Sequence, residues 1–218
     1  NKMKKWFSDE IKSQNYKGEY YYAYATKANY YSEVVVSALN DIDMLETSSA
    51  YDISLIIMLA KYKYIKKGFT VICNGFKNEF YIENIKTLLK MGINVIPIIE
   101  NEREFELLSR LNGFKFNVGL RYNSDFESRL IKHNFHSKDA FDNRFGFDEA
   151  NIEKLAQKIS LCNFMTLKVL HFHFGGTIEN IDNYIRGFSN IVEIYCKLKK
   201  SYPSLEIFDF GGGMPVKY

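Results

Sequence analysis

The sequence predicts an α/β fold in which repeated strand-helix units build a parallel sheet. Two observations predict it. Short apolar stretches of strand length alternate with longer stretches of helical period along the chain, and no polar linker interrupts this alternation. Only three prolines occur in 218 residues. We therefore expect a single domain, and seven such units fit either a doubly wound sheet or an eight-stranded barrel that lacks one strand.

Seven segments have the length and the apolar content of buried strands. In chain order they are Tyr20–Thr26, Asp43–Thr47, Thr70–Cys73, Asn94–Ile99, Phe116–Arg121, Leu167–Phe174 and Leu205–Phe210. Among the segments between them, Asn78–Met91 and Glu149–Leu161 have the clearest helical spacing. Gly68 and Gly92 stand where helix C-caps are expected.

The composition argues against several classes of protein. The 29 basic and 26 acidic residues nearly cancel, and no basic run is longer than a pair such as Lys66-Lys67, so we expect no nucleic-acid partner. The longest apolar run, Ile53–Ala60, is far shorter than the roughly 20 residues that cross a bilayer, so we expect no membrane association. Three widely spaced cysteines without a Cys-x-x-Cys pattern suggest neither disulfides nor zinc, which fits a reducing cytoplasm.

Lys27 ends the first predicted strand, where an ammonium group would lie at the strand's C-terminal end. Barrel enzymes place catalytic groups at that end. A lysine partly desolvated by neighbouring Tyr and Ala side chains could attack a carbonyl and form a Schiff base. Taken alone, the residue also fits a surface lysine that closes a strand.

Two histidines end the sixth predicted strand. The alternation of a strand puts His171 and His173 on one face, so that one imidazole could point from the barrel interior toward its mouth and lie flat against a cofactor ring. A pair of hydrogen-bonded core histidines is the alternative. No third ligand with suitable spacing accompanies them, so we predict no metal site.

Three consecutive glycines, Gly211, Gly212 and Gly213, follow Asp209-Phe at the end of the seventh predicted strand. Their backbone amides could hold a phosphate, and the loop after the seventh strand is a recurrent phosphate site in barrels. A flexible turn is the alternative. The segment lacks the spacing of dinucleotide and P-loop motifs.

Three further charged residues stand near strand ends. They are Glu46 after the second strand, Arg121 after the fifth, and Arg144 in the long irregular stretch 122–147. Such a long stretch on the rim of a barrel is usually functional or mobile. Each charge could contact a phosphate or a carboxylate, and each fits a solvated rim charge equally well.

In this order the segments resemble the fold-type III pyridoxal-phosphate enzymes, the family of the ornithine, arginine and diaminopimelate decarboxylases, whose barrel is shared by alanine racemase. The similarity runs over nearly the whole chain. Tyr-Ala-Thr-Lys27-Ala-Asn is similar to the family's cofactor-lysine strand and Leu-Glu46-Thr-Ser-Ser to its second-strand acidic segment. His-Phe-His173-Phe-Gly is similar to its ring-stacking histidine, Asp-Phe-Gly211-Gly-Gly to its phosphate-binding glycines, and Arg144-Phe-Gly to a further signature.

Three stretches are most similar to the bacterial biosynthetic arginine decarboxylases within this family. They are Ile72-Cys-Asn-Gly-Phe-Lys77, Leu170 to Ile181, and Phe208 to Tyr218. One difference concerns the phosphate site, because relatives usually carry serine where this chain has Gly176. Thr177 would then have to supply the missing hydroxyl.

The resemblance implies an incomplete (β/α)8 TIM-type barrel of the alanine-racemase-like type, with about seven βα units. Residues 1–218 would form the pyridoxal-phosphate-binding barrel domain in part, and residues 1–19 would be the remnant of an N-terminal lead-in segment. The eighth strand and the C-terminal β-domain, which in the family complete a site shared across a homodimer or higher homo-oligomer, are absent before Tyr218.

The resemblance also implies pyridoxal-phosphate-dependent decarboxylation of a basic amino acid, with L-arginine to agmatine in polyamine biosynthesis as the first choice. Lys27 would hold the cofactor and His173 would lie against its ring, while Glu46 and Arg121 would tune the surroundings of both. The implied phosphate contacts are Gly176, Thr177, Gly211, Gly212 and Gly213, and the implied substrate contacts are Phe208, Asp209 and Met214.

Other functions stay open at this point. The same family decarboxylates ornithine, lysine or diaminopimelate, and it also admits a non-catalytic pyridoxal-phosphate-binding barrel. A barrel that serves only as a regulatory or interaction partner is disfavoured, because Lys27, His173 and all three glycines are present. Without the eighth-strand acid that pairs with the pyridinium nitrogen, we expect these 218 residues to bind the cofactor weakly and to decarboxylate poorly or not at all.

Overall fold

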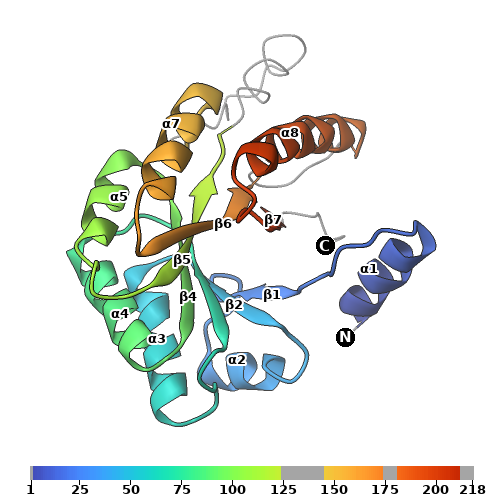
Figure 1. The fold of residues 1–218 in the computed structure, drawn as a ribbon. Coiled ribbons are helices and arrows are strands. Elements are labelled where there is room, and N and C mark those ends of the chain that lie inside the picture. Colours follow the sequence, from blue (N-terminus) through green and yellow to red (C-terminus); the bar gives the residue numbers. More distant parts are fainter. Residues whose placement is uncertain (1, 124–144, 174–180, 212–218) are drawn as a thin grey trace, which may run out of the picture. The chain divides into compact units, whose positions relative to one another are not determined.

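The computed structural model describes residues 2–123, 145–173 and 181–211, along which helices and strands alternate (Figure 1). The strands are β1 (Ala23–Ala25), β2 (Met44–Thr47), β3 (Thr70–Cys73), β4 (Asn94–Ile99), β5 (Phe116–Arg121), β6 (Met165–Phe172) and β7 (Ile207–Phe210). The helices are α1 (Lys2–Ser13), α2 (Ser32–Ala38), α3 (Ala50–Lys61), α4 (Glu79–Lys90), α5 (Glu102–Ser109), α7 (Glu149–Ser160) and α8 (Ile181–Ser201). Each predicted strand overlaps an observed one, which confirms the predicted alternation.

The strand order decides between the two predicted fold classes. Every described strand pairing is parallel, and the order follows the sequence from β1 to β7. A doubly wound sheet reverses its strand order at a switch point, whereas a (β/α)8 barrel never does. The topology is therefore that of a (β/α)8 barrel with seven of its strands.

The contacts of the chain divide it into two compact units, Asn1–Ile96 and Pro97–Tyr218. The first contains the paired strands β1, β2 and β3, in which Ala25 lies opposite Glu46 and Glu46 opposite Ile72. The second contains β5, β6 and β7 together with the end of β4, whose Ile98 and Ile99 pair with β5.

Polar side chains determine where four of the helices begin. Ser49, Asn78, Asn101 and Asp148 are the N-caps of α3, α4, α5 and α7, and each accepts a hydrogen bond from the backbone N–H three residues further on. Such a cap satisfies one of the free N–H groups of the first turn. Acidic residues in these first turns complement the positive end of the helix dipole. The predicted helices at Asn78–Met91 and Glu149–Leu161 are confirmed, with ends shifted by one residue.

One of the two predicted helix C-caps is correct and the other is wrong. Gly92 follows Met91, the C-cap of α4, with a φ of +77°. Gly68 is not a C-cap, because α3 already ends at Lys61, and Lys63 takes the left-handed conformation with a φ of +64°. The N–H of the next residue donates to the Leu59 carbonyl, which closes the helix end around Lys63.

The sixth strand begins earlier than predicted. It runs from Met165 to Phe172 rather than from Leu167 to Phe174, so that His173 follows the strand instead of lying within it. The ends of the predicted irregular stretch are joined, because Tyr122 and Phe147 form a parallel bridge.

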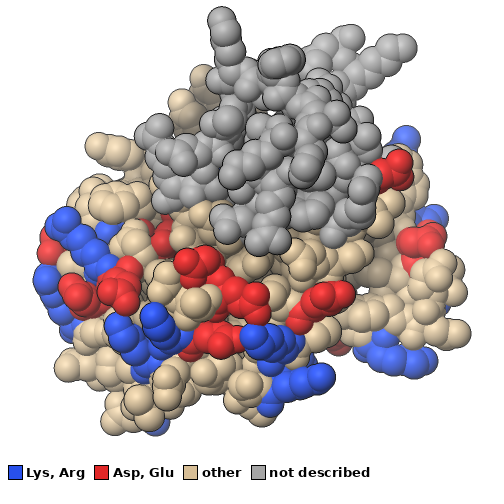
Figure 2. Space-filling model, turned by 90° about the horizontal axis from the view of Figure 1, so that it is seen from above, with Lys and Arg blue, Asp and Glu red and all other residues tan. Residues whose placement is uncertain are grey.

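In the segments that the structure describes, no helix has both the length and the apolar character needed to cross a membrane. On the face drawn in Figure 2, acidic and basic side chains of the described residues lie beside one another.

Candidate active site

Lys27 lies two residues beyond the end of β1, in a turn, and its side chain is exposed. The residue before it, Thr26, is fully buried and anchors this turn to β2, because its backbone N–H and its hydroxyl donate to the Glu46 carbonyl at 2.9 and 3.0 Å. Glu46 itself is half-buried in β2. The structure therefore places two predicted site residues, Lys27 and Glu46, at the C-terminal ends of neighbouring strands.

Asp52, in the first turn of α3, receives four hydrogen bonds and was missed by sequence reasoning. The Thr26 hydroxyl donates to Oδ2 at 3.2 Å, the N–H and hydroxyl of Ser48 each at 3.0 Å, and the Ser49 hydroxyl donates to Oδ1 at 2.7 Å. Burial alone would raise the pKa of Asp52, but the hydrogen bonds outweigh it and hold the pKa below its usual value of 3.8. The carboxylate thereby links the turn before Lys27 to α3. The capping pattern Ser49-x-x-Asp52 was the available sequence signal.

We expect Asp52→Asn to weaken folding in a pH-dependent way. A carboxyl whose pKa is lowered by folding stabilises the protein above its unfolded pKa, and this contribution disappears as the pH falls through the folded pKa. The variant should therefore lose about 1 to 2 kcal/mol of unfolding free energy at pH 7. The difference in unfolding free energy between the variant and wild type should shrink as the pH falls below 3.8, the usual pKa of an aspartate. Urea unfolding between pH 7 and pH 3 measures it, and a difference that stays constant over this range would contradict the assignment.

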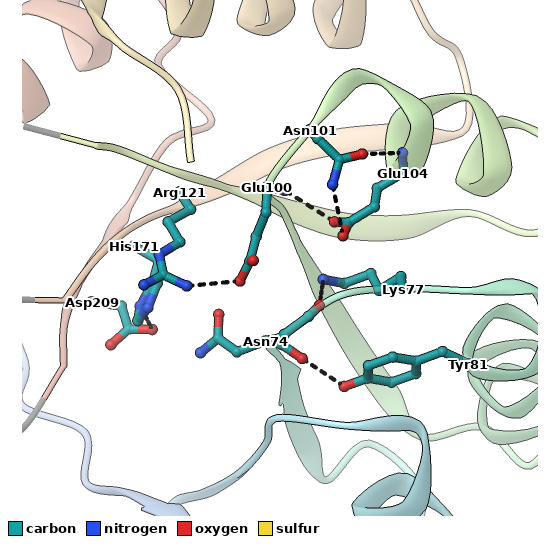
Figure 3. Close-up of polar contacts among 10 residues, drawn as sticks. Asn74, Lys77, Tyr81, Glu100, Asn101, Glu104, Arg121, His171 and Asp209 are labelled. Carbon is teal, nitrogen blue, oxygen red and sulfur yellow. Dashed lines mark hydrogen bonds and ion pairs between the residues drawn. The ribbon is translucent and has the colours of Figure 1, made fainter. Parts of the chain in front are cut away.

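In the second unit, four polar side chains lie at the C-terminal ends of β4 to β7 (Figure 3). Arg121 pairs in register with His171, and His171 with Asp209, so the three side chains share one face of the sheet. The Arg121 guanidinium donates to Glu100 Oε1 at 3.0 Å, and His171 Nδ1 lies 2.9 Å from Asp209 Oδ2. Glu100 and His171 are 3% and 2% exposed, so both interactions are largely shielded from water.

Neighbouring groups fix the Glu100–Arg121 ion pair in place. The carboxylate of Glu104 accepts the backbone N–H of Glu100 at 3.0 Å and the side-chain amide of Asn101 at 3.2 Å (Figure 3). The guanidinium of Arg121 also lies 5.3 Å from the ring centre of Phe145, a cation–π contact. Sequence reasoning singled out Arg121 but missed Glu100, whose one signal was its position between the fourth strand and a helix N-cap.

His173 and Gly211 lie in direct contact. The N–H of Gly211 donates to the Phe172 carbonyl at 2.6 Å, and a Cβ added to Gly211 would lie 2.3 Å from Cδ2 of His173. Only a residue without a side chain leaves the imidazole where it is. The structure thus brings together the predicted ring-stacking histidine and the first glycine of the predicted phosphate segment.

The two described residues predicted to contact substrate point to opposite faces of β7. Asp209 is on the face of Arg121 and His171. Phe208 is on the other face, where its ring lies 5.6 Å from that of Phe188 and 5.4 Å from that of Tyr195, both on α8. Alternation along a strand makes this opposition unavoidable for neighbouring residues. The predicted substrate contact of Phe208 stays a prediction.

Six predicted site residues lie outside the described residues: Arg144, Gly176, Thr177, Gly212, Gly213 and Met214. In the ranges 2–123, 145–173 and 181–211, no three His, Cys, Asp or Glu side chains are grouped as a metal site would require.

The family of the chain follows from a comparison of its sequence with models of protein families. Residues 5–218 match the family model described as "Pyridoxal-dependent decarboxylase, pyridoxal binding domain". The chain belongs to the pyridoxal-dependent decarboxylases. Pyridoxal phosphate is therefore its cofactor, and the predicted family is confirmed.

Individual relatives of this decarboxylase chain agree. It is 28% identical over 221 residues to the biosynthetic arginine decarboxylase of Shewanella frigidimarina, a match that covers 97% of this chain and 34% of the relative. It is 29% identical over 228 residues to the arginine decarboxylase of Avena sativa, covering 100% of this chain and 37% of the relative. The decarboxylase chain thus spans about a third of the length of these relatives.

Solved structures show the same fold. The biosynthetic arginine decarboxylase of Campylobacter jejuni has a TM-score of 0.74 at 26% identity, over 97% of this chain and 34% of that one. The diaminopimelate decarboxylase of Helicobacter pylori, complexed with L-lysine, has a TM-score of 0.71 at 21% identity, over 94% of this chain and 51% of that one. The predicted incomplete barrel of this family is confirmed.

The described residues fit pyridoxal phosphate in each unit separately. In the first, an exposed amine follows a strand whose neighbour carries Glu46. In the second, an imidazole lies against a glycine with no space for a Cβ, beside a row of charged groups. A Schiff-base lysine and a flat aromatic contact are what this cofactor needs from a protein.

Proposed function

We propose that this protein decarboxylates L-arginine to agmatine, with pyridoxal phosphate held covalently by Lys27. The observation that carries the choice of arginine is the similarity of the whole chain to biosynthetic arginine decarboxylases, 28% identity over 97% of its length. When bound, the cofactor supplies the electron sink that makes loss of carbon dioxide possible. The protein's own contribution is attachment, orientation and charge.

Each side chain has a distinct task in this proposal. The amine of Lys27 would hold the cofactor covalently, and the imidazole of His173 would contact its ring. The glycine segment Gly211 to Gly213 would hold the phosphate through the backbone amides of Gly212 and Gly213, because the N–H of Gly211 already donates to the Phe172 carbonyl. The hydroxyl of Thr177 and the backbone of Gly176 would be further contacts. A glycine backbone suits this task because its N–H groups can approach a phosphate closely.

The charged side chains set the charge around the cofactor and contact the substrate in this proposal. Glu46 stands on the strand beside that of Lys27 and would place a negative charge in the surroundings of the cofactor. The pair of Arg121 and Glu100 maintains a fixed positive group at the end of β5. Asp209 and Met214, with Phe208, contact the substrate in this proposal. The carboxylate of Asp209 also orients the imidazole of His171 through its contact with Nδ1. A hydrogen bond at one ring nitrogen determines whether the other nitrogen donates or accepts.

We expect Gly211→Ala to weaken cofactor binding without unfolding the protein. The new Cβ would lie 2.3 Å from Cδ2 of His173, so the imidazole must leave its position. Losing one aromatic stacking contact corresponds to about tenfold weaker binding of pyridoxal phosphate. Gly113→Ala is the matched control, because a Cβ there meets nothing within 4 Å. Spectroscopic titration measures both, and equal affinities for the two variants would contradict the role of Gly211.

A second substrate class stays open. The matching chains include diaminopimelate decarboxylases and a lysine/ornithine decarboxylase from Vibrio vulnificus complexed with cadaverine, with a TM-score of 0.64 at 19% identity. The likeness of these structures to this chain is a likeness of fold alone. Decarboxylation of ornithine, lysine or diaminopimelate is therefore the alternative, and a barrel that binds the cofactor without catalysis is the other.

Substrate titration of the cofactor-loaded protein separates these possibilities. Arginine should change its visible absorbance at lower concentration than ornithine, lysine or diaminopimelate, and agmatine should be the amine found by mass spectrometry. A response to diaminopimelate or ornithine at lower concentration than to arginine would overturn the choice of substrate. A spectrum that none of the four changes would favour the non-catalytic alternative.

We further propose a cytoplasmic protein that works as a homodimer or higher oligomer in polyamine biosynthesis. Residues 1–218 would act as one pyridoxal-phosphate-binding domain, with residues 1–19, which include α1, as its lead-in segment. Because these 218 residues span about a third of their relatives, we expect the 218-residue polypeptide by itself to bind the cofactor weakly and to release carbon dioxide slowly or not at all. Turnover of arginine at the rate of an intact relative would contradict this expectation.

A further inference from the structure

The side-chain amide of Asn74 is buried without a partner. Asn74 directly follows β3 and is 5% exposed. Among the described residues, neither its Nδ2 nor its Oδ1 has a hydrogen-bond partner. Burying an amide in this state is costly, and folded proteins rarely accept the cost without a functional reason.

The backbone of Asn74, in contrast, is tied on both sides. Its N–H donates to the Thr47 carbonyl at 2.9 Å, and its carbonyl accepts the hydroxyl of Tyr81 at 2.9 Å (Figure 3). The same hydroxyl lies 2.7 Å from Oγ1 of Thr47, and the ring of Tyr81 is fully buried. These shielded hydrogen bonds hold the end of β3 against β2 and α4.

The next residue restricts the segment further. Gly75 has a φ of +78°, and a Cβ on it would lie 1.9 Å from the Ser48 carbonyl oxygen. Its own carbonyl accepts the ammonium group of Lys77 at 2.8 Å. With both carbonyls of Asn74-Gly75 bound by buried side chains, the position from which the amide extends is fixed. A fixed polar group supported by neighbouring bonds is what ligand recognition requires.

The strand register places this amide on the sheet face that carries Glu46. Ala25, Glu46 and Ile72 lie side by side in β1, β2 and β3. Side chains alternate along a strand, so Asn74, two positions after Ile72, shares the face of Glu46, whereas Lys27 lies in the turn that follows β1. Thr47, which bonds to Tyr81 of α4, faces the opposite side. The amide therefore belongs to the sheet face that carries Glu46, and it lies at the same end of the sheet as the turn of Lys27, which follows β1.

We propose that the Asn74 amide donates from Nδ2 to an anionic oxygen of the ligand attached at Lys27. This inference rests on the proposed function. Besides the phosphate, which the proposed function assigns to the glycine segment, two groups have this chemistry: the phenolate of pyridoxal phosphate and the carboxylate of the amino-acid substrate. In either case Asn74 is a binding residue, and Tyr81 and Lys77 are positioning residues that hold its backbone.

The proposal predicts opposite effects on stability and on binding. Asn74→Ala removes a buried amide that has no described protein partner, so the ligand-free protein should be as stable as wild type or more stable. Its affinity for the ligand should fall about tenfold, as expected for one hydrogen bond to a charged oxygen. Asn74→Asp keeps the shape but presents a carboxylate to an anion, and should bind more weakly still.

Asn84 provides the matched control in the same unit. Its Nδ2 donates to the Ala50 carbonyl at 3.1 Å and to the Ser54 hydroxyl at 3.4 Å. Asn84→Ala should therefore lower the melting temperature of the ligand-free protein and leave ligand affinity unchanged. A residue with a purely structural role follows the pattern of Asn84.

The test combines thermal unfolding without ligand with two titrations followed by absorbance. Weaker binding of pyridoxal phosphate to Asn74→Ala assigns the contact to the phenolate. Unchanged cofactor binding with weaker binding of arginine to the loaded protein assigns it to the carboxylate. If Asn74→Ala binds both as wild type does, or loses stability as Asn84→Ala does, the inference is wrong while the proposed function stands. If wild type forms no covalent adduct with the cofactor at Lys27, the proposed function fails and the inference with it.

Discussion

Lys27→Ala is expected to abolish the visible absorption band that wild-type protein develops with pyridoxal phosphate. The band requires a Schiff base between the aldehyde and a lysine amine, and alanine has no amine to offer. Lys27 follows β1 in a turn anchored by Thr26, so the substitution removes an exposed side chain and should change the unfolding free energy by less than about 0.5 kcal/mol.

A second lysine in the same unit serves as the control for this result. Lys61, exposed in the last turn of α3, is on a helix rather than at a strand end. Lys61→Ala should keep the full band at every cofactor concentration. A band of wild-type intensity in Lys27→Ala would contradict the assignment of the cofactor lysine, whatever the effect of the control.

Glu100→Ala should have the largest effect on stability, about 3 kcal/mol or more of unfolding free energy. The carboxylate is 3% exposed and bonds to the Arg121 guanidinium at 3.0 Å. Its removal leaves a shielded cation without its counter-charge, which costs more than the ion pair contributes. Urea unfolding monitored by circular dichroism measures the loss.

Glu102 offers a matched ion pair two residues away. It bonds to Lys158 at 3.2 Å, but the two side chains are 70% and 51% exposed. Glu102→Ala should therefore cost less than about 1 kcal/mol. In Glu100→Ala, a further Arg121→Leu should restore part of the lost stability, because an apolar side chain replaces the unpaired charge. Equal losses for Glu100→Ala and Glu102→Ala would contradict the importance of burial.

The parts of the fold that could be predicted from the sequence are those that depend on local patterns of residues. β3, β4 and β5 have the predicted ends, because each is a short apolar run bounded by turn residues. The strand order, which separates a barrel from a doubly wound sheet, depends on pairings between segments far apart in the chain, and periodicity contains no information about those. The resemblance to a family supplied this missing step.

The candidate site also contains residues that could be predicted from the sequence and residues that could not. Alternation along the sixth predicted strand grouped His171 with His173. In the structure, His171 is buried and hydrogen-bonded to Asp209, while His173 follows β6 and lies against Gly211. Glu100 was missed because its partner is 21 residues away on another strand. The buried amide of Asn74, which has no hydrogen-bond partner among the described residues, could not be predicted either, because burial is a property of the folded chain alone.

The attachment point of the cofactor tests the central claim most directly. The protein is incubated with pyridoxal phosphate, reduced with borohydride to make the bond permanent, digested and mapped by mass spectrometry. At limiting cofactor the label should appear on Lys27 and on no other lysine. A label on Lys77, the fully buried lysine after β3, or on any residue other than Lys27, would contradict it.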